Sequence, residues 1–175
     1  MRHREPTPWR EPALRWSLDP QVRHLNHGSF GAVPVAVQEE QARLRRLTEW
    51  NPVRWFATLH SRIAAAREDM ADLLGVEHGQ LVFVYNASAG ASVVYEALLD
   101  RGRCDVMVTD HGYGAITMGA ERLARRSGGQ ATTVPIPLAA DADEVLDRLT
   151  VAMDEHRPGL LVIDQVTSAT ARAFP

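Results

Sequence analysis

The segment YNASAG at 85–90 has the residue types of a phosphate-binding turn. An apolar run ends at Tyr85, small residues follow it, and a helix is predicted to begin near Ser88. Free N–H groups and the positive end of the dipole at a helix start attract a phosphate, and the Ser88 hydroxyl adds a donor. The small side chains of Ala89 and Gly90 allow a close approach. Taken alone, these residues favour a simpler role for Ser88, that of a helix cap.

Two more polar loops follow apolar runs. The loop DHGYGA at 110–115 contains His111 and Tyr113, and either ring could stack on a flat ligand, which gains about 0.5–1.5 kcal/mol beyond burial. Without further information, a His beside a Tyr is more typical of a capped loop than of a binding site. The loop DQVTS at 164–168 ends in two hydroxyl side chains. In parallel α/β sheets, ligands collect at the carboxyl ends of the strands, where all three loops are predicted to lie.

Two further candidates lie nearer the N-terminus. In NHGSFG at 26–31, glycines on either side of an aromatic residue permit positive φ and a tight turn, although a plain surface turn is nearly as consistent with these residues. In NPVRWF at 51–56, Arg54 could bind a carboxylate. It could equally be a structural ion-pair partner, and the residue types favour neither role.

The second half of the chain alternates between short apolar runs and helical stretches. The apolar runs lie at 81–85, 105–109, 131–136 and 160–166, and the helical stretches at 89–100, 113–127 and 141–156. This alternation predicts an α/β fold, with a parallel-rich sheet covered by helices on both faces. The runs are apolar throughout, as expected for strands buried on both sides. Four such strands leave an open edge, which a partner chain or, in the favoured interpretation, further sequence must cover.

The first half is predicted to be helical after an extended start. Residues 1–20 are rich in proline and are expected to form an arm with a short turn. A helix is expected after Pro34 as far as Trp50, where an Asn-Pro pair ends it, since proline disfavours helix in the preceding residue. A second helix is expected at about 57–74, with Gly75 as its C-terminal glycine.

The composition is that of about one globular domain. The 175 residues are 45% hydrophobic and 23% charged, with a net charge of −3. Arginines are interleaved with carboxylates, which argues against a nucleic-acid surface, and no apolar run approaches the roughly 20 residues of a membrane span. Because the N-terminus is charged and proline-rich without an apolar core, no secretory signal is expected, and the single cysteine, Cys104, cannot form an internal disulfide. With no Cys/His cluster of metal-ligand spacing, we expect a cytoplasmic protein without a metal site.

Four motifs together resemble a known family. In chain order they are LNHGSFGAVP, FVYNASAGAS, VTDHGYGA and VIDQVTSATARAFP. Over about residues 16–175 their order and spacing resemble the N-terminal portion of the class V aminotransferase-like pyridoxal-phosphate enzymes, in the isopenicillin-N-epimerase-like branch. The resemblance implies part of the large domain of a fold-type I transferase, and a dimer. The expected boundaries are 1–33 for the arm and substrate-side loop, 34–78 for a helical segment, and 79–175 for an incomplete cofactor-binding domain.

The resemblance also implies which residues meet the cofactor, pyridoxal 5′-phosphate. Asn86, Ser88 and Ala89 correspond to the turn that grips the phosphate, with Ser88 in the place of a threonine. Tyr113, or in second place His111, would stack on the pyridine ring.

The remaining implied contacts concern the phenolic oxygen of the cofactor and the substrate. Thr167 and Ser168 would hydrogen-bond the phenolic oxygen, although the sequence departs from the family's pattern directly after Ser168. The implied substrate-side residues are His27, Gly28, Ser29 and Arg54.

The chain lacks the residue on which the chemistry of this family depends. All 19 basic side chains are arginine, and no other side chain can form the imine by which a lysine amine holds the cofactor. The family's lysine, and its aspartate that pairs with the pyridine nitrogen, are expected beyond residue 175, and Asp164 is too early to be that aspartate. We therefore predict that this chain alone has no catalytic residue, is inactive, and binds the cofactor without a covalent bond at best.

Two functions from different classes remain open. The first is a pyridoxal-phosphate enzyme acting on an amino-acid-like substrate, completed as a homodimer or by a complementing downstream segment. Epimerase, aminotransferase and C–S lyase reactions share a first step with the ring as electron sink, and the epimerase type is the nearest match. The alternative is a non-catalytic remnant or interaction module that keeps the fold and the phosphate cup.

Overall fold

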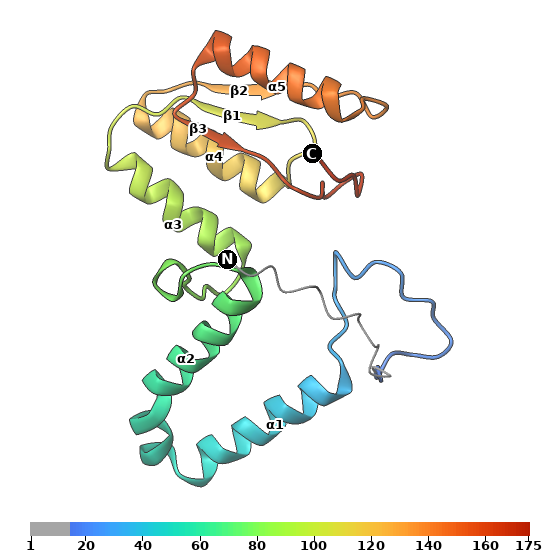
Figure 1. The fold of residues 1–175 in the computed structure, drawn as a ribbon, viewed down its shortest axis with the longest axis vertical. Helices are drawn as coiled ribbons and strands as arrows, with labels where there is room; N and C mark the ends of the chain where they lie inside the picture. The colour runs from blue at the N-terminus through green and yellow to red at the C-terminus, as the bar shows by residue number, and fades with distance from the viewer. Residues whose placement is uncertain (1–14) are drawn as a thin grey trace, which may run out of the picture. The chain divides into compact units, whose positions relative to one another are not determined.

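The computed structural model describes residues 15–175, which form two compact units. The first unit ends at Val82, and the second runs from Phe83 to Pro175 (Figure 1). Most of the expected proline-rich arm, residues 1–14, lies outside the described residues.

The first unit is helical, as the sequence predicts. Its elements are α1 (Val35–Trp50), α2 (Pro52–Leu74) and the 3-10 turn η1 (His78–Gln80). Helix α2 begins at Pro52 instead of near Ala57, because a proline needs no N–H donor at the first helical position. Asn51 caps this start, since its side-chain oxygen accepts the Arg54 N–H at 3.0 Å. Gly75 ends the helix with a φ of 68°, in the left-handed region where glycine is favoured.

The second unit is built on a parallel sheet. Its strands are β1 (Val106–Thr109), β2 (Ala131–Val134) and β3 (Leu160–Val162), in the order β2-β1-β3. Its helices are α3 (Ala87–Leu99), α4 (Gly114–Ser127) and α5 (Ala142–His156). Val106 of β1 lies opposite Ala131 of β2 and Leu160 of β3, and both pairings are parallel. The predicted α/β fold is therefore confirmed, with strands shorter than the apolar runs that predicted them.

Helices cover both faces of this sheet (Figure 1). On one face, Met107 of β1 packs with Val145 and Leu149 of α5. On the other face, Val106 and Val108 pack with buried residues of α4. All three β1 side chains are at most 1% exposed, and burial of one such side chain contributes about 1.5–3 kcal/mol. The two helix layers thus hold β1, and the loop that follows it, in a fixed position.

The apolar segment 81–85 is not a strand, so the prediction of a fourth strand was wrong. Leu81 has extended backbone angles (φ −113°, ψ 135°), but within the described residues no strand pairs with the segment. Val82 is 72% and Phe83 51% exposed, and Tyr85 is fully exposed. The N–H and C=O groups of a strand need a neighbouring strand as their partner. Apolar composition alone therefore does not make this segment part of the sheet.

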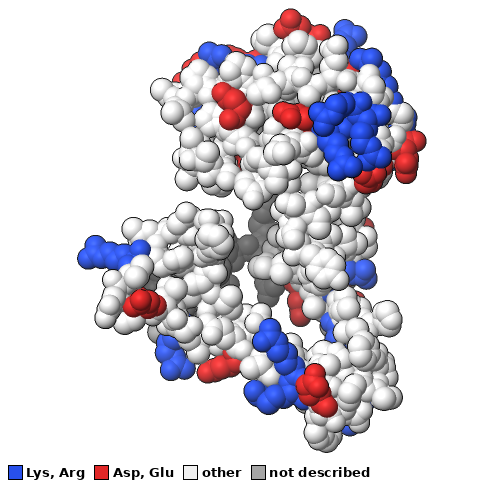
Figure 2. All heavy atoms as spheres, turned by 180° about the vertical axis from the view of Figure 1, so that it is seen from behind, with Lys and Arg blue, Asp and Glu red and all other residues white. Residues whose placement is uncertain are grey.

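Arginines of the second unit form local ion pairs with carboxylates. Arg126 pairs with Glu96 and Arg103 with Asp105, each at 2.9 Å. Figure 2 shows acidic groups beside arginines on the face that it draws. Exposed pairs of this kind contribute only about 0–1 kcal/mol each.

The Asp105 carboxylate ties together the starts of two strands. Its Oδ1 accepts the Gln130 N–H at 2.7 Å, next to the start of β2, and the Arg103 guanidinium at 2.9 Å. The hydrogen bond from Gln130, and after it that from Arg103, holds the pKa of Asp105 below its usual range.

We expect Asp105→Asn to lower the stability of the protein at neutral pH. A carboxyl pKa that is lowered by folding contributes stability above the unfolded pKa, and this contribution is lost as the pH falls through the folded pKa. The urea midpoints of the variant and the parent should therefore differ at neutral pH and converge in acid. A midpoint difference that stays constant over the whole pH range would contradict this role of the charge.

Candidate functional site

The loop after β1 is held tightly at the carboxyl edge of the sheet. Asp110 Oδ1 accepts the Ile136 N–H at 2.9 Å, and the Gly112 N–H donates to Thr109 O at 3.2 Å. A Cβ on Gly112 would lie 2.5 Å from Thr117 Oγ1, so a larger residue would force the Thr117 side chain to shift. The loop therefore has a defined course between the strand and the helix.

Tyr113 lies at the start of α4 and beside the chain that leaves β3. Its N–H donates to Asp164 Oδ2 at 2.9 Å, which joins the loop after β1 to the loop after β3. Tyr113 precedes the first helical residue and is 50% exposed. An exposed ring at this edge of a parallel sheet can stack on a flat ligand.

His111 is enclosed by its neighbours, unlike Tyr113. It is only 7% exposed, with Nε2 at 2.7 Å from Ile136 O and Nδ1 at 3.1 Å from Thr170 Oγ1. The Phe174 ring meets it edge-on, with the ring centroids 5.7 Å apart. Of the two rings named as stacking candidates, Tyr113 is the one accessible to a ligand in this structure.

The two hydroxyls after β3 also differ in their surroundings. Thr167 is 2% exposed, and its Oγ1 accepts the Arg172 N–H at 2.9 Å and lies 2.6 Å from Thr170 Oγ1. Ser168 is exposed. Because internal partners already use the Thr167 hydroxyl, Ser168 offers the more accessible donor.

The turn before α3 differs from its predicted form. The helix begins at Ala87, and its cap is Asn86, whose Oδ1 accepts the Ala89 N–H at 2.9 Å. Ser88 is therefore not the cap, and the Ala89 N–H that was expected to meet a phosphate is bonded within the turn. The Ser88 hydroxyl is exposed, and the N–H groups of Ala87 and Ser88 belong to the first turn, where a helix provides no internal acceptor.

Helix α3, which begins at this turn, packs beside α4, which begins at the carboxyl edge (Figure 1). Tyr95 OH of α3 donates to Ile116 O of α4 at 3.0 Å. No hydrogen bond in the described residues joins Ser88 to the two loops, so their convergence on one ligand stays a prediction.

Three residues that organise this edge were not among the predicted site residues. They are Asp110, Asp164 and Thr170, whose side chains bond residues 26, 51 and 59 positions away in the sequence. The available signal was their place in the loops that follow strands. No local sequence pattern can indicate a hydrogen-bond partner that lies so far away in the sequence.

The predicted substrate-side loop lies in the first unit. The Ser29 and Phe30 N–H groups both bond Asn26 O at 3.3 Å, which closes the tight turn that was expected. Its glycines do not use the positive φ that their residue type permits, and the turn closes with ordinary backbone angles. A Cβ on Gly31 would lie 3.2 Å from His27 O, which is closer than an ordinary contact. His27 Nδ1 accepts the Ala32 N–H at 3.4 Å, and a Cβ on Gly28 would make only an ordinary contact with Asn26 Oδ1, at 3.8 Å.

Arg54 lies in the first turn of α2, where its side chain is exposed. It lines a cavity of about 330 Å³ together with Trp50, Trp55 and Arg62. The Arg62 guanidinium stacks on the Trp55 ring at 4.7 Å from its centroid. Across residues 15–175 Arg54 forms no ion pair, so neither of its two predicted roles gains support from a partner.

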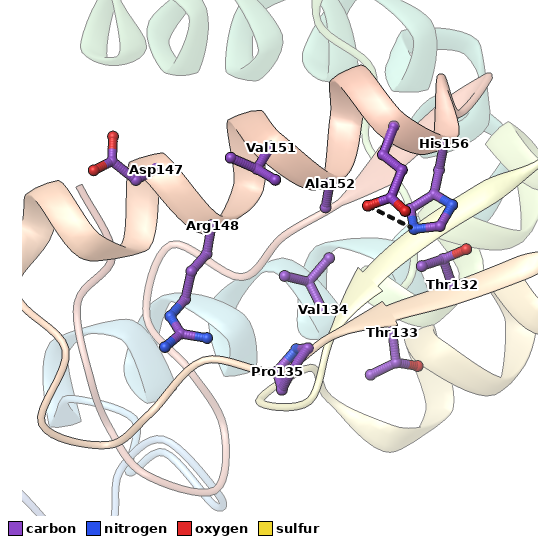
Figure 3. Close-up of a pocket in the computed structure, with 10 residues that line it drawn as sticks. Thr132, Thr133, Val134, Pro135, Asp147, Arg148, Val151, Ala152 and His156 are labelled. Atoms are coloured by element: carbon purple, nitrogen blue, oxygen red, sulfur yellow. Dashed lines mark ion pairs between the residues drawn. The ribbon is translucent and has the colours of Figure 1, made fainter.

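A groove of about 400 Å³ lies between α5 and the outer edge of β2. Figure 3 shows Arg148 and His156 extending from α5 beside Thr132 and Pro135 of the strand side. Both side chains have carboxylate neighbours on α5 itself, Glu144 for Arg148 at 2.8 Å and Glu155 for His156 at 4.0 Å. The groove is lined by none of the predicted site residues.

Two kinds of feature were not found in the part of the chain that the structure describes. No group of three or more His, Cys, Asp and Glu side chains is arranged to hold a metal ion. None of the described helices is both long enough and apolar enough to cross a membrane.

Several curated proteins resemble most of this chain, although no protein-family model matches it. The chain is 31% identical over 175 residues to a probable chloroplastic L-cysteine desulfhydrase of Arabidopsis thaliana, covering 90% of this chain and 36% of that protein. It is 28% identical to the isopenicillin N epimerase of Streptomyces clavuligerus and 29% to that of Amycolatopsis lactamdurans. These matches cover 95% and 97% of this chain, and 42% and 43% of the epimerases.

The fold is also found in solved structures, of which we describe one example. It is a lysine-to-alanine mutant of C-DES with glycine covalently linked to its PLP cofactor, and it superposes with a TM-score of 0.73 at 20% identity. The match covers 87% of this chain and 40% of that one. The chain thus spans about two fifths of the length of the relatives that it matches.

Proposed function

We propose that this chain, which belongs to the class V aminotransferase-like pyridoxal-phosphate enzymes over the part of their length that it matches, supplies the phosphate- and ring-binding side of a cofactor site. The whole protein would act on an amino-acid-like substrate. When bound, the cofactor supplies an electron sink for a group that leaves Cα. The observation that carries the proposal is the exposed Tyr113 ring at the carboxyl edge, fixed by the hydrogen bond from its N–H to Asp164.

The donors present suit the phosphate and the ring of this cofactor. The Ser88 hydroxyl and the free N–H groups at the start of α3 would bind the phosphate, as helix starts commonly bind anions. Tyr113 would lie against the ring, and Ser168 would donate to its phenolic oxygen. Thr167 would contribute by holding Ser168 in place, because its own hydroxyl is bonded internally.

The side chains of these 175 residues do not suit the covalent attachment of the cofactor. None of the 19 basic side chains is a lysine, and an arginine guanidinium stays protonated at any ordinary pH. The proposal therefore requires a lysine from outside these 175 residues, in a complementing segment or in a second copy of the whole protein.

The names of the relatives indicate a common class of substrate, but they do not agree on one reaction. They include L-cysteine desulfhydrase and isopenicillin N epimerase, so both C–S cleavage and epimerisation are represented. We propose epimerase-type chemistry first and lyase or aminotransferase chemistry second. The alternative is a non-catalytic interaction module that keeps the fold and the phosphate cup.

Binding of pyridoxal 5′-phosphate to the purified chain tests the cofactor site. Titrations should give weaker binding for pyridoxal, which has no phosphate, and inorganic phosphate should compete with pyridoxal 5′-phosphate. We expect Ser88→Ala to weaken the binding about tenfold, because a hydrogen bond to a charged group contributes about 1.5–3 kcal/mol. Tyr113→Leu should weaken it about fivefold and Tyr113→Phe very little, since only the ring is needed.

The control for Ser88 is a serine one turn later in the same helix. Ser92→Ala removes a hydroxyl that bonds Ser88 O at 2.8 Å, without removing a proposed phosphate donor. This variant should bind like the parent. Equal affinities for pyridoxal and its phosphate, or equal losses in the two alanine variants, would contradict the proposed function.

A further inference from the structure

The chain after β3 forms a closed loop that carries Ser168 at its turn. The Thr167 N–H donates to Arg172 O at 2.8 Å, and the Phe174 N–H donates to Gln165 O at 2.9 Å. Val166 and Ala173 add an antiparallel bridge. We call residues 165–174 the Ser168 loop. Its backbone bonds close it on itself, so its position depends on the contacts that it makes with the rest of the unit.

One of these contacts is made by His111, and its two hydrogen-bond partners indicate which nitrogen carries the proton in the neutral ring. Ile136 O can only accept a hydrogen bond, so His111 Nε2, at 2.7 Å from it, must carry the proton. In the neutral ring Nδ1 is then an acceptor, and the Thr170 hydroxyl at 3.1 Å must donate to it.

The direction of the remaining hydrogen bonds follows from that tautomer. Since Thr170 donates its proton to His111, its oxygen accepts from the Thr167 hydroxyl at 2.6 Å, a shorter contact than the 3.3 Å from that hydroxyl to Arg172 O. Thr167 in turn accepts the Arg172 N–H at 2.9 Å. One directed chain of hydrogen bonds therefore runs from the Ser168 loop through a buried ring to the segment that follows β2.

We infer that His111 is a positioning residue for Ser168, acting as a neutral Nε2–H tautomer that fastens the Ser168 loop to the carbonyl of Ile136. This inference rests on the proposed function for its premise that Ser168 meets the cofactor. His111 does not touch the ligand itself, because its ring is buried against Phe174 and both of its nitrogens are bonded.

A second attachment of the same loop makes the His111 contact testable without unfolding the loop. The Arg172 guanidinium donates to the carbonyls of Pro137, at 2.7 Å, and Leu138, at 3.1 Å, and also contacts Ala140 O. It also lies over the Phe174 ring, 5.5 Å from its centroid. Removal of the Thr170 hydroxyl therefore breaks the hydrogen bond to His111 and leaves the Arg172 contacts in place.

Thr170→Val and Thr170→Ser form a matched pair for the test. Valine keeps the shape of threonine but cannot donate to Nδ1, whereas serine keeps the donor. The ring ¹⁵N signals of His111 in the parent should show a proton on Nε2 and an acceptor at Nδ1. Amide exchange at Arg172 and Phe174 should be about five- to tenfold faster in Thr170→Val, and within about twofold of the parent in Thr170→Ser.

The affinity for pyridoxal 5′-phosphate, measured on the same proteins, completes the test. It should fall about fivefold in Thr170→Val and be restored in Thr170→Ser. A proton on Nδ1, unchanged amide exchange in Thr170→Val, or faster exchange with unchanged affinity would each overturn the inference. A parent chain that shows the expected tautomer and exchange but binds no pyridoxal 5′-phosphate would contradict the proposed function and support the fastening of the loop by His111.

Discussion

Gly129→Ala is expected to destabilise the second unit by about 3 kcal/mol or more. A Cβ at Gly129 would lie 2.0 Å from Cys104 O and 2.5 Å from Cys104 C. Both neighbours are backbone atoms, so no side chain can rotate away to make room. Insertion of a methyl group into a packed core usually costs about 1–3 kcal/mol, and here the backbone must move as well.

The backbone that would have to move leads directly into the central strand. Cys104 is held by hydrogen bonds with Ser127 Oγ, and it precedes β1, whose Val106 and Met107 are at most 1% exposed. A loss of 3 kcal/mol is a large share of the 5–15 kcal/mol that stabilises a typical domain. With a urea dependence of about 2 kcal/mol per molar, the unfolding midpoint should fall by about 1.5 M.

Gly114→Ala is the matched control, because it adds the same methyl group to the same helix–strand unit. At Gly114, in the first turn of α4, an added Cβ meets nothing within 4 Å. Alanine is also the better helix former by up to about 1 kcal/mol. This variant should unfold at or slightly above the parent midpoint in urea. A Gly129→Ala midpoint equal to that of the control would show that the junction at Cys104 is not tightly packed.

The helices of this chain could be predicted because their signals are local. Asp141 caps α5 by accepting the Glu144 N–H at 2.9 Å, three residues along the chain, and Gly128 ends α4 with a φ of 76°. Such signals lie within a few residues of the helix end that they mark. The strand β1 was predictable for a related reason, since it is buried along its whole length and such a run is mostly apolar. The strand β2 does not fit this reason, because it contains two threonines and is partly exposed.

The segment 81–85 had the same apolar signal as these strands, and there the prediction failed. A strand is defined by its neighbours, and composition does not record whether a neighbour is present. The sequence accordingly predicted where extended chain occurs, but not which extended segments join the sheet.

The candidate site was harder to predict, because the residues of one loop have partners in different parts of the sequence. His111 and Tyr113 are two positions apart, yet His111 is buried by Ile136 and Thr170, while Tyr113 is half-exposed and bonds Asp164. The sequence indicated that this loop could present a ring. Which ring it presents depends on the packing of three loops, and no spacing within one loop contains that information.

Borohydride reduction in the presence of pyridoxal 5′-phosphate is expected to leave residues 15–175 unlabelled. A stable reduced adduct requires a primary amine, and these residues contain no lysine. In the 175-residue chain, the α-amine of Met1 is the one primary amine that remains. Peptide mapping by mass spectrometry should therefore find any adduct on the first peptide alone, and a chain with an acetylated N-terminus should carry none. An adduct on any peptide from the second unit would contradict the prediction.

The same reaction distinguishes the two proposed functions when a lysine is supplied from outside the chain. A complementing segment that carries the lysine of a relative should become labelled at that lysine if this chain forms the rest of the cofactor site. The labelling should then decrease with Ser88→Ala and Tyr113→Leu, because these side chains would hold the phosphate and the ring beside the amine, and it should be unaffected by Ser92→Ala. Labelling that is the same with all three variants would mean that the chain contributes nothing to cofactor binding. That result would favour the interaction module, because the fold would then persist without the site that its relatives' names imply.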